Sequence, residues 1–258
     1  MLKDFPIHAS LAAADLARAR AWYAERLGLL PEREYEGILV YRLGPSPFTV
    51  YQTAFAGTAQ NTVAGWRVDD LRAEVARLRA RGVVFQDYDF GEVRTIDGVL
   101  TDTDGDMSAW FKDADGNVFA LAEGHDEPNP NLGMVAVLAV SDMARARAWY
   151  AERIGIEPSR EWEGLARYDS GSTRFSLYET TSAGTARNTV AAWRVDDLRA
   201  EMGTLRACGL IFEEYDFGDR RTVDGVLEDA EDGALYAWFT DSEGNVLGIV
   251  EDHDASPG

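Results

Sequence analysis

Few side chains in this sequence can supply a nucleophile, a proton or a metal ligand. The 258 residues include three histidines, His8, His125 and His253, and one cysteine, Cys208. A hydroxyl or thiol nucleophile needs an adjacent base, and no nucleophile motif stands near these histidines. No glycine-rich phosphate-binding loop is present either. We therefore expect no catalytic triad, a structural thiol at Cys208, and exposed chain ends around His125 and His253, which follow the last predicted strand of each half.

An acidic run suggests a calcium loop but lacks two of its required residues. Asp102, Asp104 and Asp106 alternate along the chain as calcium ligands do. However, Met107 stands where such a loop needs glycine, and Asp113 stands where it needs glutamate. We expect a solvated loop at this place.

The chain contains one domain twice. The string ARARAWYAER occupies residues 17–26 and recurs at 144–153, and the match extends over almost the whole chain. A period near 127 residues is too long for a solenoid and fits a duplicated domain. The prolines and asparagines of 126–131 are typical of a linker. The sequence therefore predicts one domain at 1–125 and a second at 132–253.

The composition indicates an acidic globular protein. The formal net charge is −20, and 46% of the residues are hydrophobic. Because this charge repels phosphate, neither nucleic acid nor an anionic membrane is expected as a partner. The N-terminal segment lacks the basic and apolar regions of a signal peptide, and no apolar run approaches the roughly 18 residues that span a bilayer. We expect a cytoplasmic protein whose partner is a small molecule.

The pattern within each half predicts two successive units of a strand, a helix and further strands. Asp15 is expected to cap a helix that ends at Gly28, and Asp69 and Asp70 to cap a helix that ends at Gly82. Alternating apolar residues before and after each helix predict strands. The expected fold class is therefore α+β.

These motifs together resemble the vicinal oxygen chelate superfamily, which includes glyoxalase, bleomycin resistance and extradiol dioxygenase proteins. The likeness rests on the run 8–29, with its tryptophan-tyrosine pair, and on the strings WRVDDLRAEVARLRARGV and WFKDADGNVFAL. The resemblance covers both halves and implies four βαβββ modules in two tandem domains. Since single domains of this family commonly pair, it also implies a monomer with an internal pseudo-dimer.

The resemblance implies where a catalytic metal would bind. Metal-dependent members carry ligands at three strand positions of a cavity. The corresponding residues are His8, Val63 and Ala120 in one half and Val135, Val190 and Gly248 in the other. Only His8 has a side chain that can coordinate a metal ion, whereas a catalytic site needs about three protein ligands. We therefore expect no metal and no cofactor.

Strand alternation predicts which side chains face the cavity. Trp66 and Val68 are expected to pack on the helix, and the YDFG segments at Tyr88 and Tyr215 are expected near the cavity mouth or as packing loops. The expected ligand-binding residues are His8, Ser10, Val63, Gly65, Arg67, Trp110, Val137, Val190, Ala192, Arg194 and Trp238. Small residues beside tryptophans leave room for an aromatic ligand.

Two functions agree with these features. The favoured one is a metal-independent protein of the bleomycin-resistance type, which sequesters a hydrophobic or aromatic compound, neutral or cationic, such as an antibiotic. The alternative is a lyase, isomerase or dioxygenase of the superfamily that acts on a small metabolite. Such an enzyme would use a displaced metal site around His8, or a carboxylate base, for which Glu34 and Glu161 are the first candidates.

Overall fold

The computed structural model describes residues 1–89, 91, 93–124, 133–218, 220–230 and 233–252. The chain forms two units, Ala9–Val137 (the first unit) and Met1–His8 with Leu138–Gly258 (the second unit). The predicted linker 126–131 and the histidines His125 and His253 lie outside the described residues.

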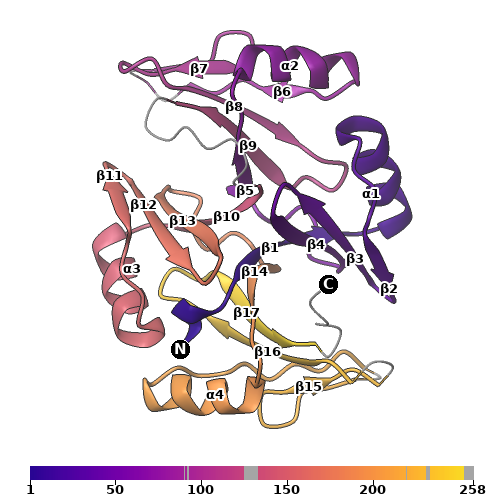
Figure 1. Ribbon diagram of the computed structural model, residues 1–258, viewed down its shortest axis with the longest axis vertical. Helices are drawn as coiled ribbons and strands as arrows, with labels where there is room; N and C mark the ends of the chain where they lie inside the picture. The colour runs from indigo at the N-terminus through magenta and orange to yellow at the C-terminus, as the bar shows by residue number, and fades with distance from the viewer. Residues whose placement is uncertain (90, 92, 125–132, 219, 231–232, 253–258) are drawn as a thin grey trace. The chain divides into compact units, whose positions relative to one another are not determined.

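The first unit begins with a βαβββ module (Figure 1). Its elements are β1 (Ile7–Ala13), α1 (Leu16–Trp22), β2 (Arg33–Tyr35), β3 (Ile38–Leu43) and β4 (Ser46–Gln52). Strand β4 returns parallel to β1, and β3 and β2 follow as antiparallel neighbours. The strand order is therefore β1-β4-β3-β2.

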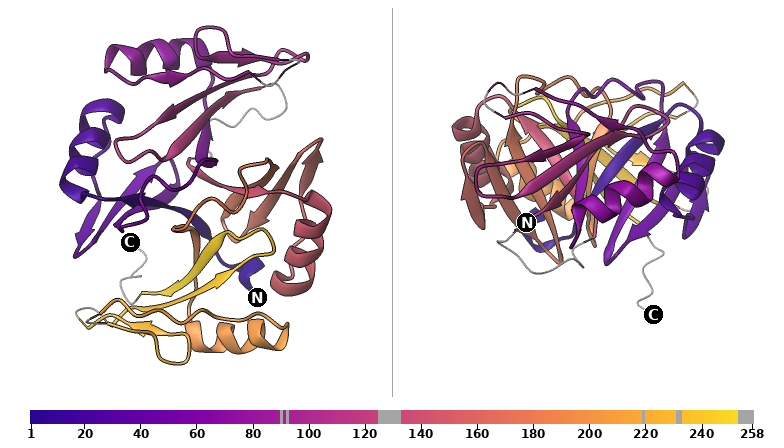
Figure 2. Two further views of the ribbon diagram at one scale, coloured as in Figure 1. Left: turned by 180° about the vertical axis from the view of Figure 1, so that it is seen from behind. Right: turned by 90° about the horizontal axis from the view of Figure 1, so that it is seen from above.

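A second module of the same plan completes the first unit. Its elements are β5 (Thr62–Arg67), α2 (Leu71–Ala80), β6 (Phe85–Gln86), β7 (Val99–Thr101), β8 (Met107–Lys112) and β9 (Val118–Glu123). Strand β9 is parallel to β5 and antiparallel to β8, while β6 and β7 both pair with β8. Helix α2 covers one face of these strands (Figures 1 and 2).

The second unit repeats both modules. Its elements are β10 (Val135–Val140), α3 (Met143–Trp149), β11 (Arg160–Trp162), β12 (Leu165–Ser170), β13 (Thr173–Glu179), β14 (Thr189–Arg194), α4 (Leu198–Ala207), β15 (Leu227–Glu228), β16 (Leu235–Thr240) and β17 (Val246–Glu251). The predicted α+β fold of four βαβββ modules is confirmed.

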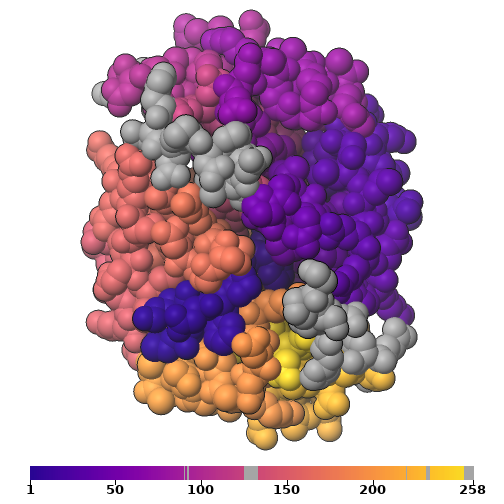
Figure 3. All heavy atoms as spheres, in the orientation of Figure 1, coloured from indigo at the N-terminus to yellow at the C-terminus, as the bar shows by residue number. Residues whose placement is uncertain are grey.

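The two units do not start and end where the sequence repeat does, because two short segments pack with the other half. The Ile7 backbone shares two hydrogen bonds of 2.8 Å with the Thr173 hydroxyl, and the Arg194 N–H donates to the Pro6 carbonyl. In Figure 3 the indigo N-terminal residues lie against the salmon and orange atoms of the second unit. In the first unit, Val135 and Ala136 pair with β5.

Local signals explain the helices. Asp15 accepts the Arg18 N–H at 3.0 Å, and Asp70 accepts the Ala73 N–H at 2.8 Å, so both predicted caps are confirmed. The helix of α1 continues as one π turn over Tyr23–Leu27 and stops at Gly28, whose φ of 77° suits glycine. The sequence did not predict the π turn. No helix of the described residues is long and apolar enough to cross a membrane.

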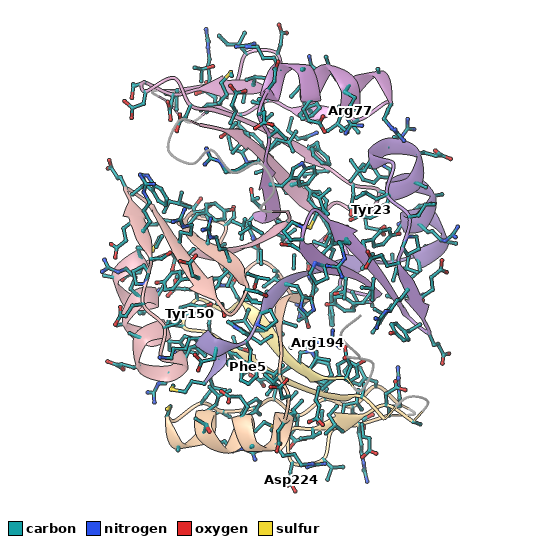
Figure 4. All side chains as sticks on the ribbon, viewed as in Figure 1. Phe5, Tyr23, Arg77, Tyr150, Arg194 and Asp224 are labelled. Carbon is teal, nitrogen blue, oxygen red and sulfur yellow. The ribbon has the colours of Figure 1, made fainter. Side chains whose placement is uncertain are left out.

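A buried polar network fixes each first helix on its sheets. Tyr23 donates to Asp113 at 2.9 Å, and Asn117 donates both to Asp113 and to the Ala12 carbonyl. Burial raises the pKa of Asp113 to about 6. Tyr150, Asp241 and Asn245 repeat the network in the second unit. Tyr23 and Tyr150 project from the turns after α1 and α3 (Figure 4).

Candidate functional site

One face of strands β14, β17 and β16 in the second unit carries three of the predicted site residues of that half, Ala192, Arg194 and Trp238. The registers align Ala192 with Gly248 and Trp238, and Arg194 with Val250 and Tyr236. Cross-strand partners point to the same side of a sheet, so these six side chains share one side, here called the Trp238 face. The opposite side belongs to the core: Trp193, Ala237, Phe239, Leu247 and Ile249 are 0% exposed.

Aromatic rings on this face form a corner. The Trp238 ring stacks beside Tyr236 at 6.1 Å and 12°. Tyr215 and Phe217, from the segment after α4, meet Trp238 at 85° and 65°, and they stack on each other at 30°. Two partly exposed aromatic walls therefore stand nearly perpendicular. Tyr215, Phe217, Tyr236 and Trp238 are named the aromatic corner below.

Two polar side chains of the second unit, His8 and Arg194, lie near the Trp238 face. The His8 side chain keeps a small exposed area, but its buried surroundings, and then the positive charge of Arg194, lower the pKa of His8 to about 4. The imidazole is therefore neutral at pH 7. Arg194, labelled in Figure 4, forms an ion pair with Asp252. The face thus presents a neutral histidine and a charge-compensated arginine.

The first unit has a corresponding face on β5, β9 and β8. Gly65 aligns with Ala120 and Trp110, and Val135 of β10 pairs with Gly65. This set is named the Trp110 face. The ring of Tyr88 meets Trp110 edge-on at 5.6 Å and 87°.

The Trp110 face also carries two polar residues, Arg67 and Ser108. Arg67 donates to the Gly124 carbonyl at 2.8 Å. Ser108 takes the position that Tyr236 holds in the second unit, since it aligns with Ala122 as Tyr236 aligns with Val250.

Glycine and alanine change places between the two faces: Gly65 pairs with Ala120 in the first unit, and Ala192 pairs with Gly248 in the second. At Gly65 an added Cβ would lie 2.8 Å from the Ala120 carbonyl oxygen, so the backbone requires glycine there. At Gly248 an added Cβ would meet ordinary contacts of 3.4 Å to Ala192 and 3.7 Å to Trp238. Gly248 therefore leaves a space of about one methyl group beside Trp238, and no side chain is needed to fill it for folding.

Not every predicted residue belongs to these faces. A β-bulge lies between Thr62 and Ala64, and another lies between Thr189 and Ala191. Strict alternation does not continue through a bulge. It therefore cannot place Val63 and Val190, which are 1% exposed and offer no surface.

Two predicted residues lie on other strands. Ser10 of β1 is 5% exposed and accepts a hydrogen bond from Thr49 at 3.2 Å. Val137, its counterpart in β10, is partly exposed.

The described residues show no group of three or more His, Cys, Asp or Glu side chains that is arranged to hold a metal ion. Asp102 accepts the backbone N–H groups of Asp104 and Asp106 at 2.9 Å, which closes an exposed loop. Glu34 pairs with Arg20 on the surface, and Glu161 pairs with Arg147. These exposed ion pairs give no support to either glutamate as a general base.

Sequence reasoning missed two members of the aromatic corner, Phe217 and Tyr236. The extra residue near Glu231 shifts the repeat from 127 to 128, and with this shift Tyr236 corresponds to Ser108. The signal was present in the strings LYAWF and MSAWF, which align the two strands once the shift is allowed.

Comparisons with known proteins agree with this architecture. Residues 6–121 match the model of the Glyoxalase/Bleomycin resistance protein/Dioxygenase superfamily. No curated protein matches the sequence. Glyoxalase I from Zea mays matches with a TM-score of 0.63 at 17% identity, over 95% of this chain and 91% of its own. A candidate dioxygenase from Bacillus subtilis subsp. subtilis str. 168 matches with a TM-score of 0.59 at 18% identity, over 97% of this chain and 85% of its own.

At these identities the structural likeness shows the fold and leaves the activity open. The family model, in contrast, matches the sequence of the first domain, and the internal repeat carries its motifs into the second. Residues 6–121 therefore belong to the Glyoxalase/Bleomycin resistance protein/Dioxygenase superfamily.

Proposed function

We propose that the protein binds a planar aromatic small molecule, neutral or cationic, on the Trp238 face, without a metal ion. The observation that carries this proposal is the aromatic corner, in which Tyr215 stands at 85° to Trp238. A planar ligand can stack on one wall while its edge meets the other wall, and both are preferred aromatic geometries. Gly248 leaves space beside the indole. An antibiotic with a fused aromatic ring is one ligand of this class.

The surrounding charge favours a cationic ligand. Glu213, Glu214 and Asp216 flank Tyr215 in the sequence, and the chain carries a net charge of −20. A cation over an aromatic ring gains energy from the negative ring face, and the acidic field raises its local concentration. Arg194 does not cancel this preference, because Asp252 compensates its charge.

Metal-independent binding is supported by the residues at the family's ligand positions. Ala120 and Gly248 have no coordinating group, and Val63 and Val190 are buried aliphatic residues. Elemental analysis of the purified protein should find no stoichiometric zinc, iron, nickel or manganese. About one metal per chain that is lost in His8→Ala would contradict metal-independent binding and favour the enzymatic alternative.

A fluorescence titration tests the ligand site. We expect 1-methylquinolinium, a planar cation, to quench tryptophan emission and to bind more tightly than neutral quinoline, with a difference that shrinks as salt is added. Trp238→Leu should weaken binding about tenfold or more, as removal of a central aromatic anchor does. Trp110→Leu is the matched control and should leave the affinity of the Trp238 face for 1-methylquinolinium unchanged. Equal binding in both variants would contradict the proposal.

A further inference from the structure

His8 lies in line with the residues of the Trp238 face. The Arg194 N–H donates to the Pro6 carbonyl at 3.1 Å. The corresponding strands of the other half pair antiparallel, with Val135 opposite Gly65. In an antiparallel pair such a hydrogen bond joins directly opposed residues, and the same kind of pair recurs two residues further on. His8 therefore lies opposite Ala192, and its side chain projects to the same side of the sheet.

Four residues thus form one row across the sheet. The registers join Ala192 to Gly248 and Gly248 to Trp238, so His8 stands at one end of the row and Trp238 at the other. Neighbouring strands lie about 4.8 Å apart, which separates the Cα atoms of the two end residues by roughly 14 Å. Ala192 and Gly248 are buried, whereas His8 and Trp238 keep exposed surface. The row therefore places two small residues between two rings.

The imidazole of His8 supplies the hydrogen-bond acceptor of this row. Within the residues that the structure describes, the imidazole makes no hydrogen bond to another residue. Its buried surroundings, and then the positive charge of Arg194, hold the pKa of His8 at about 4, so at pH 7 one ring nitrogen is an acceptor. Ala192 and Gly248 have no polar side-chain atom, and the indole of Trp238 only donates.

The fold of the module does not require this histidine. The corresponding residue of the other half is Val135, which pairs with Gly65 in the same register. A polar group that is shielded from water and left without a partner costs free energy, whereas valine at the same place costs none of this kind. A partner that arrives with the ligand would remove the cost for His8.

We propose that His8 selects ligands of the Trp238 face by accepting a hydrogen bond from a hydroxyl group at the end of the ligand's aromatic ring system. This inference rests on the proposed function and narrows its ligand class to planar aromatic molecules with such a hydroxyl, for example fused-ring phenols. The rings stack at Trp238 and extend over Gly248 and Ala192, and the hydroxyl donates to the neutral imidazole. A ligand without the hydroxyl leaves the acceptor unpaired and binds less tightly.

Calorimetric titration at pH 7 with 2-naphthol and 2-methoxynaphthalene tests this role. The two probes share their rings, but only 2-naphthol can donate a hydrogen bond. We expect the unchanged protein to bind 2-naphthol about fivefold more tightly or more. In His8→Val, which introduces the residue of the other half, and in His8→Phe, which keeps a ring but no acceptor, the two affinities should lie within about twofold of each other. Trp238→Leu should weaken both probes.

The outcomes separate the role of His8 from the proposed function. Equal affinities of the two probes for the unchanged protein would overturn the role of His8, and so would a preference for 2-naphthol that persists in either His8 variant. Melting curves identify which variants are folded, and either folded variant decides. Binding of 1-methylquinolinium, which has no hydroxyl group, tests the Trp238 face separately. If that binding does not depend on Trp238, the proposed function itself fails.

Discussion

The Trp238 face and the Trp110 face share one framework but present different side chains. Both have a tryptophan at the centre, an arginine two residues after the small residue of the neighbouring strand, and a tyrosine that meets the indole edge-on. The Trp238 face adds Tyr236 where the other has Ser108. Duplication therefore preserved the framework and allowed the surface to change.

The buried parts of the two halves show how strongly the framework is held. Tyr23 and Asp113 form the same 2.9 Å hydrogen bond as Tyr150 and Asp241. Burial raises the pKa of both aspartates, so the electrostatic setting is conserved as well. The buried network is thus the same in both halves, whereas the two faces differ at Tyr236 and Ser108.

The largest expected difference concerns the tryptophans on the core side of the sheets. Trp193 is 0% exposed and donates to the Ser170 hydroxyl at 3.0 Å, whereas Trp66 is partly exposed. We predict that Trp193→Ala lowers the free energy of unfolding by about 3–5 kcal/mol and Trp66→Ala by roughly half as much. Urea denaturation of both variants measures this. Equal losses would mean that the two cores are equivalent.

The second difference is the pH dependence of stability that His8 causes. The corresponding residue of the other half is Val135, which does not titrate. The folded-state pKa of His8 is about 4, below its ordinary value of 6.5, so only the unfolded chain takes up this proton between these values. Stability from the neutral imidazole is therefore complete above pH 6.5 and falls as the pH drops toward 4, by at most about 1.4 kcal/mol per pH unit. His8→Val should remove this part of the pH dependence. Parallel stability curves for the two proteins would contradict it.

The smallest expected difference in stability is that between alanine variants of Gly65 and Gly248. Gly65→Ala forces a methyl group against the Ala120 carbonyl at 2.8 Å and should cost about 1–3 kcal/mol. Gly248→Ala fits ordinary contacts and should change the stability by less than about 0.5 kcal/mol. Because the new methyl group lies next to Trp238, Gly248→Ala should weaken ligand binding although the protein stays folded. Thermal melts and a 1-methylquinolinium titration of both variants check the pair.

Much of the fold was predictable because its signals are local or repeated. Asp15 and Gly28 mark the first helix by capping chemistry, and the internal repeat doubles every such signal. The β-bulges at Val63 and Val190 were not predictable, because the neighbouring residues are small or apolar on both faces, so the shift in alternation leaves no mark in the sequence. Phe217 was missed for a different reason: it reaches Trp238 from a loop, and no periodicity places a loop side chain.

One exchange of residues between the faces tests the central claim most directly. Tyr236→Ser gives the Trp238 face the serine of the first unit, and Ser108→Tyr gives the Trp110 face the tyrosine of the second. We predict that calorimetry with 1-methylquinolinium shows binding about tenfold weaker in Tyr236→Ser, and a gain of affinity at a second site in Ser108→Tyr, since each stacked aromatic partner contributes about 0.5–1.5 kcal/mol beyond area burial. Unchanged affinity and stoichiometry in both variants would show that the aromatic corner is not the ligand site.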